Sequence, residues 1–334
     1  MRHPFFTLVF ISILVGFLGI GTAFSVEMKE EQQERLLNPA KPEKKILPSG
    51  LTMKASVSGG YDTNPNLSPL KKGDIFEEFL FNLGYSKVLT GKLKFTFNYD
   101  YDILNYNEIT DASTILNHLR FGLHDRFGKL RAGAGYDLAY VYYLDNDDDF
   151  LFHKGFAYIG HDITRKIYQQ LQFEYGIKDF TEQKALGDTI ATFQSKDRFD
   201  RRWNGIYSID ALLTRRLSAG FLTKFSINDS NARYQNFYDY KSYEGSPYIS
   251  YAFNSKLRLV LNFSYTRKNY DKRRVTFGND REEDNLYTGR GALKYDLNKN
   301  NSLSISYTYR DNSSNEGLEE YVENIFSAGW NYKF

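Results

Sequence analysis

The residue run with the clearest potential for chemistry is acidic: Asp145 to Asp149 holds four aspartates and one asparagine. Carboxylates at this density bind calcium when they follow the loop pattern D-x-[DN]-x-[DN]-G-x5-E. Here the sixth position is Phe150 and the twelfth is Phe156, so the turn glycine and the bidentate glutamate are both missing. We therefore expect a solvated loop, with a weak divalent-cation contact as the alternative.

Histidines are the next candidates, because a Ser–His pair could attack an ester. No histidine after the amino-terminal segment is followed two residues later by Ser, the arrangement sought in a barrel phospholipase; these histidines are His118, His124, His153 and His161. A protease would instead need carboxylates and a histidine that converge at one rim, for which Asp111, Asp145 and His153 are the candidates. We predict no enzyme activity, no catalytic residue, no metal and no cofactor.

Charged residues that alternate with apolar ones form a larger and more regular set. In the segment 93–101 the odd positions are Leu, Phe or Tyr, and the even positions include Lys94 and Asp100. A period of two is that of a β-strand with one apolar face and one polar face. If the apolar face contacts lipid, the polar face lines a hydrated lumen. The predicted lumen-lining residues are Lys94, Asp100, Arg120, Arg131, Asp137, Glu174, Lys224, Arg258, Arg290, Lys294 and Arg310.

The same alternation recurs from residue 51 to the end of the chain. About fourteen segments of roughly 10 to 14 residues follow it, which is the length of tilted membrane-spanning strands. Short connections are expected at 90–91, 128–129, 164–165, 214–215, 254–255 and 298–300, and longer ones at 64–74, 107–111, 144–149, 181–197, 231–238, 271–281 and 313–318. We predict an all-β fold, a transmembrane antiparallel up-and-down barrel of about 14 strands.

The start of the chain has a different composition. A basic start, an apolar run from Phe5 to Ile20 and small residues up to Ala23 predict a signal peptide over 1–23. Residues 24–50 are charged and contain prolines, so we expect a periplasmic tail or a small plug, and 51–334 form the barrel. The chain has no cysteine, a net charge of +2 and a mean hydropathy of −0.53. This charge balance gives no reason to expect nucleic-acid binding.

Two features are expected at the membrane interfaces. Tyrosines recur where the predicted strands end, among them Tyr106, Tyr143 and Tyr270, and they predict aromatic girdles. The basic run Lys272 to Arg274 lies in a predicted loop and could contact lipid phosphates.

The last strand carries the most specific signal. Phe326, Trp330, Tyr332 and Phe334 fall on one face, and the chain ends on that face. This pattern resembles the carboxy-terminal strand of bacterial outer-membrane barrels, in which it acts as the assembly signal. The resemblance implies the outer membrane of a Gram-negative bacterium, with membrane lipid, lipopolysaccharide and the barrel assembly machinery as partners. The strand is expected to close the barrel by pairing with residues 51–61.

A second resemblance is to one group of these barrels. The run from Gly59 to Pro69, GGYDTNPNLSP, resembles the first strand of barrels in exopolysaccharide export and of barrels that follow tetratricopeptide domains, including the surface lipoprotein assembly modifiers. The run from Tyr307 to Phe334 is similar to their final hairpin. The segment 24–50 is too short for a helical repeat domain, so the resemblance does not carry a role in lipoprotein export.

These observations predict an outer-membrane channel or conduit, either passive and porin-like or part of surface-polymer export with its export-system partners. The alternative is a non-conducting structural or assembly barrel whose loops bind a partner, including one in lipoprotein or protein secretion. A barrel enzyme is the third possibility.

Overall fold

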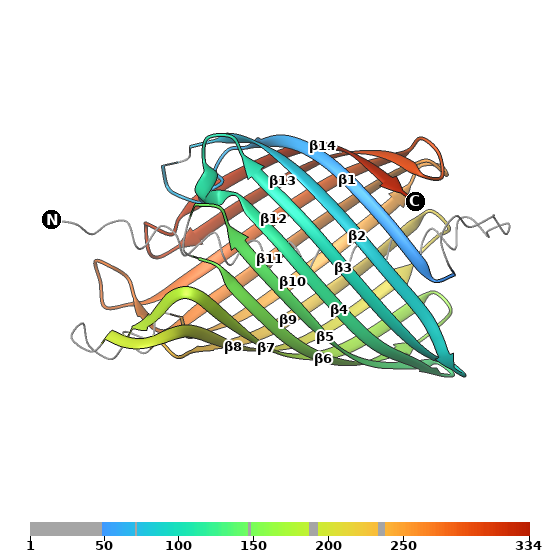
Figure 1. Ribbon diagram of the computed structural model, residues 1–334, viewed down its shortest axis with the longest axis horizontal. Helices are drawn as coiled ribbons and strands as arrows, with labels where there is room; N and C mark the ends of the chain where they lie inside the picture. Colours follow the sequence, from blue (N-terminus) through green and yellow to red (C-terminus); the bar gives the residue numbers. More distant parts are fainter. Residues whose placement is uncertain (1–48, 71, 146–147, 187–192, 233–237) are drawn as a thin grey trace.

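The computed structural model describes residues 49–70, 72–145, 148–186, 193–232 and 238–334. Within these ranges fourteen strands close into one antiparallel barrel, in which chain neighbours pair with each other (Figure 1). The strands are β1 (Leu51–Asp62), β2 (Asp74–Thr90), β3 (Leu93–Tyr106), β4 (Thr114–Phe127), β5 (Leu130–Tyr143), β6 (Phe150–Asp162), β7 (Ile167–Leu186), β8 (Phe193–Leu212), β9 (Leu217–Ser230), β10 (Tyr240–Ala252), β11 (Leu257–Arg274), β12 (Arg281–Asp296), β13 (Asn301–Ser314) and β14 (Tyr321–Lys333). The predicted fold class is confirmed.

The barrel closes where β1 meets β14. Val57 pairs with Trp330 and Tyr61 with Phe326, in an unbroken antiparallel register. This closure leaves no strand edge with unpaired N–H and C=O groups. The predicted closing role of the last strand is therefore confirmed.

Short turns join the strands at one end of the barrel, which we call the short-turn end. At four of these turns a side-chain oxygen accepts the N–H groups two and three residues later, as in Asn254 with Lys256 at 2.8 Å and Leu257 at 2.9 Å. The equivalent acceptors in the other three turns are Thr164, Thr214 and Asn298. Two further turns use Gly91 and Gly128, which have positive φ angles of 55° and 63°. The local sequence thus sets where each hairpin reverses.

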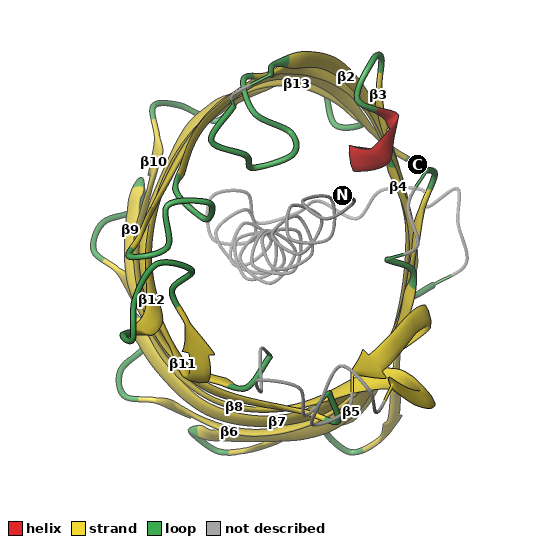
Figure 2. Ribbon diagram, turned by 90° about the vertical axis from the view of Figure 1, so that its left-hand side faces the viewer, coloured by secondary structure: helices red, strands yellow, loops and turns green. Residues whose placement is uncertain are grey.

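The opposite end, which we call the long-loop end, lies at the left of Figure 1. Figure 2 looks into this end, where the strands form a closed ring and several loops bend inward over the opening. A short 3₁₀ helix, η2 (Thr110–Ala112), lies in one of these connections. The described residues include no helix long and apolar enough to cross a membrane.

Two strands are longer than predicted. β7 and β8 each have 20 residues, so much of the loop expected at 181–197 is strand. Pairing continues past a register shift, with Lys184 opposite Asp197. Both faces of this extension carry polar residues, so the period-two signal that marks the rest of each strand is lost while the backbone ladder persists. β11 likewise continues to Arg274, into the loop expected at 271–281.

The predicted signal peptide, 1–23, and nearly all of the predicted tail or plug, 24–50, lie outside the described residues. Both stay predictions, as does a short helix expected at 28–37.

The register of β11 generates a stability prediction. Leu261 is 47% exposed on the outer face, whereas the neighbouring Asn262 points inward and its amide donates to Ser246 Oγ at 3.3 Å. If the outer face contacts hydrocarbon, Leu261→Arg should lower the free energy of unfolding by about 2 to 4 kcal/mol. The matched change Asn262→Arg should cost much less. Urea unfolding in phospholipid vesicles measures both, and equal losses would contradict the assignment of the faces.

Candidate functional site: the charged inner wall

Alternation along each strand separates an outer face from an inner face. Large apolar side chains on the outer face stay exposed, as with Phe263 at 48% and Ile305 at 58%. The positions between them carry polar and charged groups. By this alternation all eleven residues predicted to line the lumen occupy inner-face positions. Their contact with a permeating solute stays a prediction.

Four charged residues form a continuous row across β4 to β7, which we call the charge ladder. Arg120 binds Asp137 through two contacts, Nε to Oδ1 at 2.8 Å and Nη2 to Oδ2 at 3.2 Å. Lys154 Nζ lies 3.0 Å from Asp137 Oδ2 and 3.2 Å from Glu174 Oε1. Asn204 on β8 extends the row by donating to Glu174 Oε2 at 2.8 Å. Each charge in the ladder is therefore fixed by a neighbour of opposite sign or by an amide.

Other predicted residues lie in separate pairs. Arg131 binds Asp162 at 2.6 Å and Arg310 binds Glu323 at 2.8 Å. Asp100 accepts from the Asn82 amide at 2.6 Å and lies 3.5 Å from His118 Nδ1. The ladder thus joins only three of the eleven, and the inner wall is divided into several local networks.

The remaining lumen candidates are placed by register. Lys224 on β9 lies opposite Glu244 on β10. Arg258 lies opposite Lys294, and Arg290 lies on the same strand as Lys294. Lys94 is the second residue of β3, near the short-turn end. None of these five cations is a member of the ladder.

Sequence reasoning missed Lys154, the centre of the ladder. On β6 the aromatic residues Phe150, Phe152 and Phe156 share the inner face with Lys154, whereas the outer face carries Leu151, His153 and Ala157. The rule that aromatic residues mark the outer face fails on this strand, so the alternation points the wrong way. The only signal in the sequence was the spacing of Lys154 from Phe150 and Phe152, which puts the three side chains on one face of the strand. That spacing is the same for an inner face and an outer face, so it does not tell the two apart.

An apolar cluster explains why the aromatic rule fails there. Phe150, Phe152 and Phe180 pack inside the barrel at the long-loop end, together with Leu116, Ala139, Val141 and Tyr143. Only 1% of Phe150 is exposed. The sequence had suggested a uniformly polar interior. This cluster shows that part of the interior is apolar.

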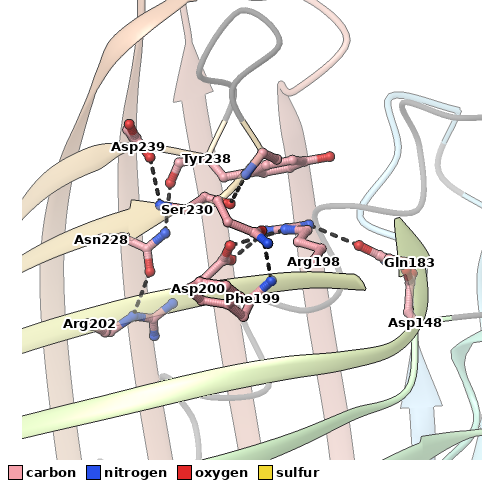
Figure 3. A network of polar contacts seen from close by, with 12 residues as sticks. Asp148, Gln183, Arg198, Phe199, Asp200, Arg202, Asn228, Ser230, Tyr238 and Asp239 are labelled. Atoms are coloured by element: carbon pink, nitrogen blue, oxygen red, sulfur yellow. Dashed lines mark hydrogen bonds and ion pairs between the residues drawn. The ribbon is translucent and has the colours of Figure 1, made fainter. Parts of the chain in front are cut away.

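Cations cover the aromatic rings at this level of the wall. Lys178 Nζ lies 3.6 Å from the centre of the Phe150 ring, and the Arg198 guanidinium lies 3.3 Å from the centre of the Tyr238 ring. Arg198 also binds Asp200, with Nε to Oδ1 at 3.1 Å, and donates to Gln183 Oε1 at 2.9 Å (Figure 3). Cation–π contacts of this kind are favourable, more so when water is excluded. We call this arrangement the cation–aromatic belt.

The structure corrects part of the expected aromatic girdle. Tyr106, Tyr143 and Tyr270 are 6–7% exposed and belong to the inner face, because each stands an odd number of positions from the outer-face residues of its strand. Tyr106 donates to Asp62 Oδ2 at 2.9 Å. Exposed rings such as Tyr243, at 52%, remain on the outer face.

Two expectations about charged loops are also wrong in part. Arg273 does not face outward towards lipid: it binds Glu282 at 2.7 Å and also Glu319, with 8% of the residue exposed. Asp149 is not solvated, because it is buried and accepts the Tyr143 N–H at 2.7 Å. Among the described residues no group of acidic or histidine side chains is arranged to hold a metal ion.

Loop carboxylates at the long-loop end differ in their pKa values. Burial would raise the pKa of Glu316, but N–H donors from Thr276, at 2.5 Å, and Leu318 outweigh it and hold the pKa below its ordinary value. Burial raises the pKa of Glu319 despite its contact with Arg273. In the same way burial raises the pKa of Tyr238 to about 12. Glu316 is therefore ionised near neutral pH and holds the β13–β14 loop against the β11–β12 loop.

Comparisons with known proteins agree with this architecture. Residues 212–334 match the family described as "Putative beta-barrel porin 2". That match covers the last part of the barrel, including the closing strand β14. No curated protein sequence matches the chain.

Solved structures give a second comparison. The chain is similar to the "CymD monoaromatic hydrocarbon channel" at 9% identity and a TM-score of 0.51, covering 86% of this chain and 89% of that one. It is also similar to OmpT of Vibrio cholerae at 11% identity and a TM-score of 0.51, covering 87% and 100%. An anion-selective porin from Comamonas acidovorans matches at 10% identity and a TM-score of 0.50, covering 85% and 99%. At these identities the likeness shows the fold alone.

The charge ladder generates a prediction at Asp137, whose side chain is 3% exposed and contacts two cations. Asp137→Asn should lower the free energy of unfolding by about 3 kcal/mol, because it leaves Arg120 and Lys154 without their shared carboxylate. Urea unfolding of the folded barrel in vesicles measures the change.

A control for Asp137→Asn is Glu283→Gln, which breaks the exposed pair of Glu283 with Arg267 at 2.7 Å. Water screens this pair, so the control should change stability little. Similar losses in the two variants would contradict the structural role of the ladder.

Proposed function

We propose that this chain forms a passive, water-filled channel in the outer membrane of a Gram-negative bacterium and admits small polar solutes. The observation that supports this most directly is the charge ladder. Moving several charges into a dry interior costs several kcal/mol for each ion, even when the charges are paired. An inner wall rich in such charges is therefore most stable in contact with water.

The size of the barrel supports the same proposal. Eight-stranded barrels are filled by their own side chains, and the interior widens as strands are added. Fourteen strands with inward charges on most of them leave room for water beside the wall. The cation–aromatic belt and the inward loops narrow the long-loop end, which favours small solutes over large ones.

A role as conduit in surface-polymer export, which the motif from Gly59 to Pro69 implies, is a narrower form of this proposal. It would require an extended polymer to pass the belt at Lys178 and Arg198. No contact within the described residues favours a polymer over a small solute, so the passive channel is the form that we propose.

Single-channel recording in planar bilayers tests the channel. The purified full chain, with its fold verified by heat-modifiable migration in gels, should give discrete and ohmic conductance steps in KCl. Heat-denatured protein from the same preparation is the control and should give none. Folded protein that inserts into the bilayer without conductance steps would contradict the channel and favour the structural barrel with partner-binding loops.

A further inference from the structure

One ammonium group in the cation–aromatic belt has no hydrogen-bond acceptor. Lys178 on β7 is only 6% exposed, and its Nζ atom lies 3.6 Å from the centre of the Phe150 ring and 4.3 Å from the centre of the Phe180 ring. Phenylalanine rings attract a cation through their faces but carry no oxygen that could accept its N–H groups. Within the part of the chain that the structure describes, Lys178 makes no hydrogen bond and no close ion pair. Its three N–H donors are therefore left for a ligand or for water.

A second lysine on the inner wall at the same end shows how the fold satisfies such a group elsewhere. Lys268 on β11 also lies between two rings, 4.6 Å from the centre of Tyr240 and 4.3 Å from the centre of Tyr270. These rings carry hydroxyl groups, and Lys268 donates to the Tyr270 hydroxyl and lies 3.9 Å from Asp284 Oδ2. A shielded donor without an acceptor costs free energy. Lys178 lacks both kinds of partner, so an acceptor from outside the chain would remove that cost.

The acidic groups that attract Lys178 most strongly are Asp200 and Asp148, and both are already engaged. Asp200 on β8 is its register partner. Both Asp200 oxygens accept from Arg198, with Nε to Oδ1 at 3.1 Å and Nη2 to Oδ2 (Figure 3). Asp148 Oδ1 accepts from the Gln183 amide. Neither carboxylate therefore serves as a close partner of the Lys178 ammonium.

Arg202 on β8 is a second cation with unused donors. It pairs in register with Gly176, two residues before Lys178, so Arg202 and Lys178 are diagonal neighbours on the inner face. Diagonal neighbours have Cβ atoms roughly 7 Å apart, a span that two long side chains and one oxyanion can bridge. Arg202 Nε donates to Asn228 Oδ1 at 3.3 Å, and its Nη atoms have no acceptor among the described residues. Arg202 and Arg198 both repel Lys178, so the three cations exceed the two carboxylates by one charge.

Two further charged groups on the neighbouring wall have partners of their own. Glu174, the next acidic residue on this face of β7, is bound by Lys154 at 3.2 Å and by the Asn204 amide at 2.8 Å. Lys224 on β9 repels Arg202 but lies opposite Glu244. The excess positive charge is thus local to Lys178 and Arg202.

We propose that Lys178 and Arg202 form a subsite on the inner wall for one oxyanion, carried by a small solute as a carboxylate or phosphate. Lys178 would supply ammonium donors, and Arg202 would supply the free edge of its guanidinium. The rings beside Lys178 are only 1% and 2% exposed, so the subsite recognises the oxyanion rather than the body of the solute. This inference rests on the proposed channel, because a solute must reach the inner face.

Titration calorimetry with inorganic phosphate tests the subsite on the folded full chain in detergent at constant ionic strength. The double variant Lys178→Gln, Arg202→Gln should bind phosphate roughly tenfold more weakly or worse, because it removes the charge-assisted hydrogen bonds to the oxyanion. Lys178→Gln alone removes no hydrogen bond or close ion pair within the chain, so the single variant should fold, and its affinity should also fall. Heat-modifiable migration in gels verifies the fold of each variant.

Lys94→Gln is the matched control. Lys94 is the second residue of β3, lies on the inner face near the opposite end, and carries the same charge as Lys178. It should leave phosphate affinity nearly unchanged, and a loss as large as that of Lys178→Gln would overturn a local subsite. Arg202→Lys keeps the charge but loses the planar fork, so it should give an intermediate affinity.

The outcomes separate the subsite from the channel. A parallel titration with glucuronate shows whether a sugar carboxylate or a phosphate is the preferred group. Wild-type protein that binds neither anion would overturn the subsite, and so would a double variant that binds as tightly as wild type. Calorimetry does not require conduction, so a barrel that binds phosphate but passes no current would support the subsite and contradict the channel. A barrel that passes current without binding either anion would overturn the subsite alone.

Discussion

The structure depends on one constraint: every strand must have a hydrogen-bonded neighbour on both sides, and only closure of the sheet satisfies the first and last strands together. Pairing of β1 with β14 achieves this closure. Because the strands pair in a continuous register around the ring, a residue that faces inward on one strand pairs with a residue that faces inward on the next strand. The outer apolar face and the inner charged face both follow from that assignment.

Charges on the inner face then need either water or a partner. Along β4 to β7 they have a partner, since the ladder fixes each charge with a neighbour of opposite sign. At the long-loop end aromatic rings take the role of partner, as with Phe150 under Lys178.

Much of the fold could be predicted from the sequence because its signals are local. Period-two alternation gave the strands, and residues such as Asn254 and Gly128 marked the turns. The site was less predictable. Lys154 was missed because β6 carries aromatic rings on its inner face, and Arg273 was placed outside because its partner Glu319 is distant in sequence. Contacts between distant segments, rather than propensities, decide such positions.

The central claim is that the outer face of the barrel wall contacts apolar lipid and the inner face contacts water. The chain contains no cysteine, so single cysteines can be placed along β11 without background. Treatment of the folded protein in vesicles with a membrane-impermeant maleimide should label the even positions from 258 to 264 and spare the odd positions from 259 to 265. Labelling without alternation, or protection of the even positions as well, would contradict the account.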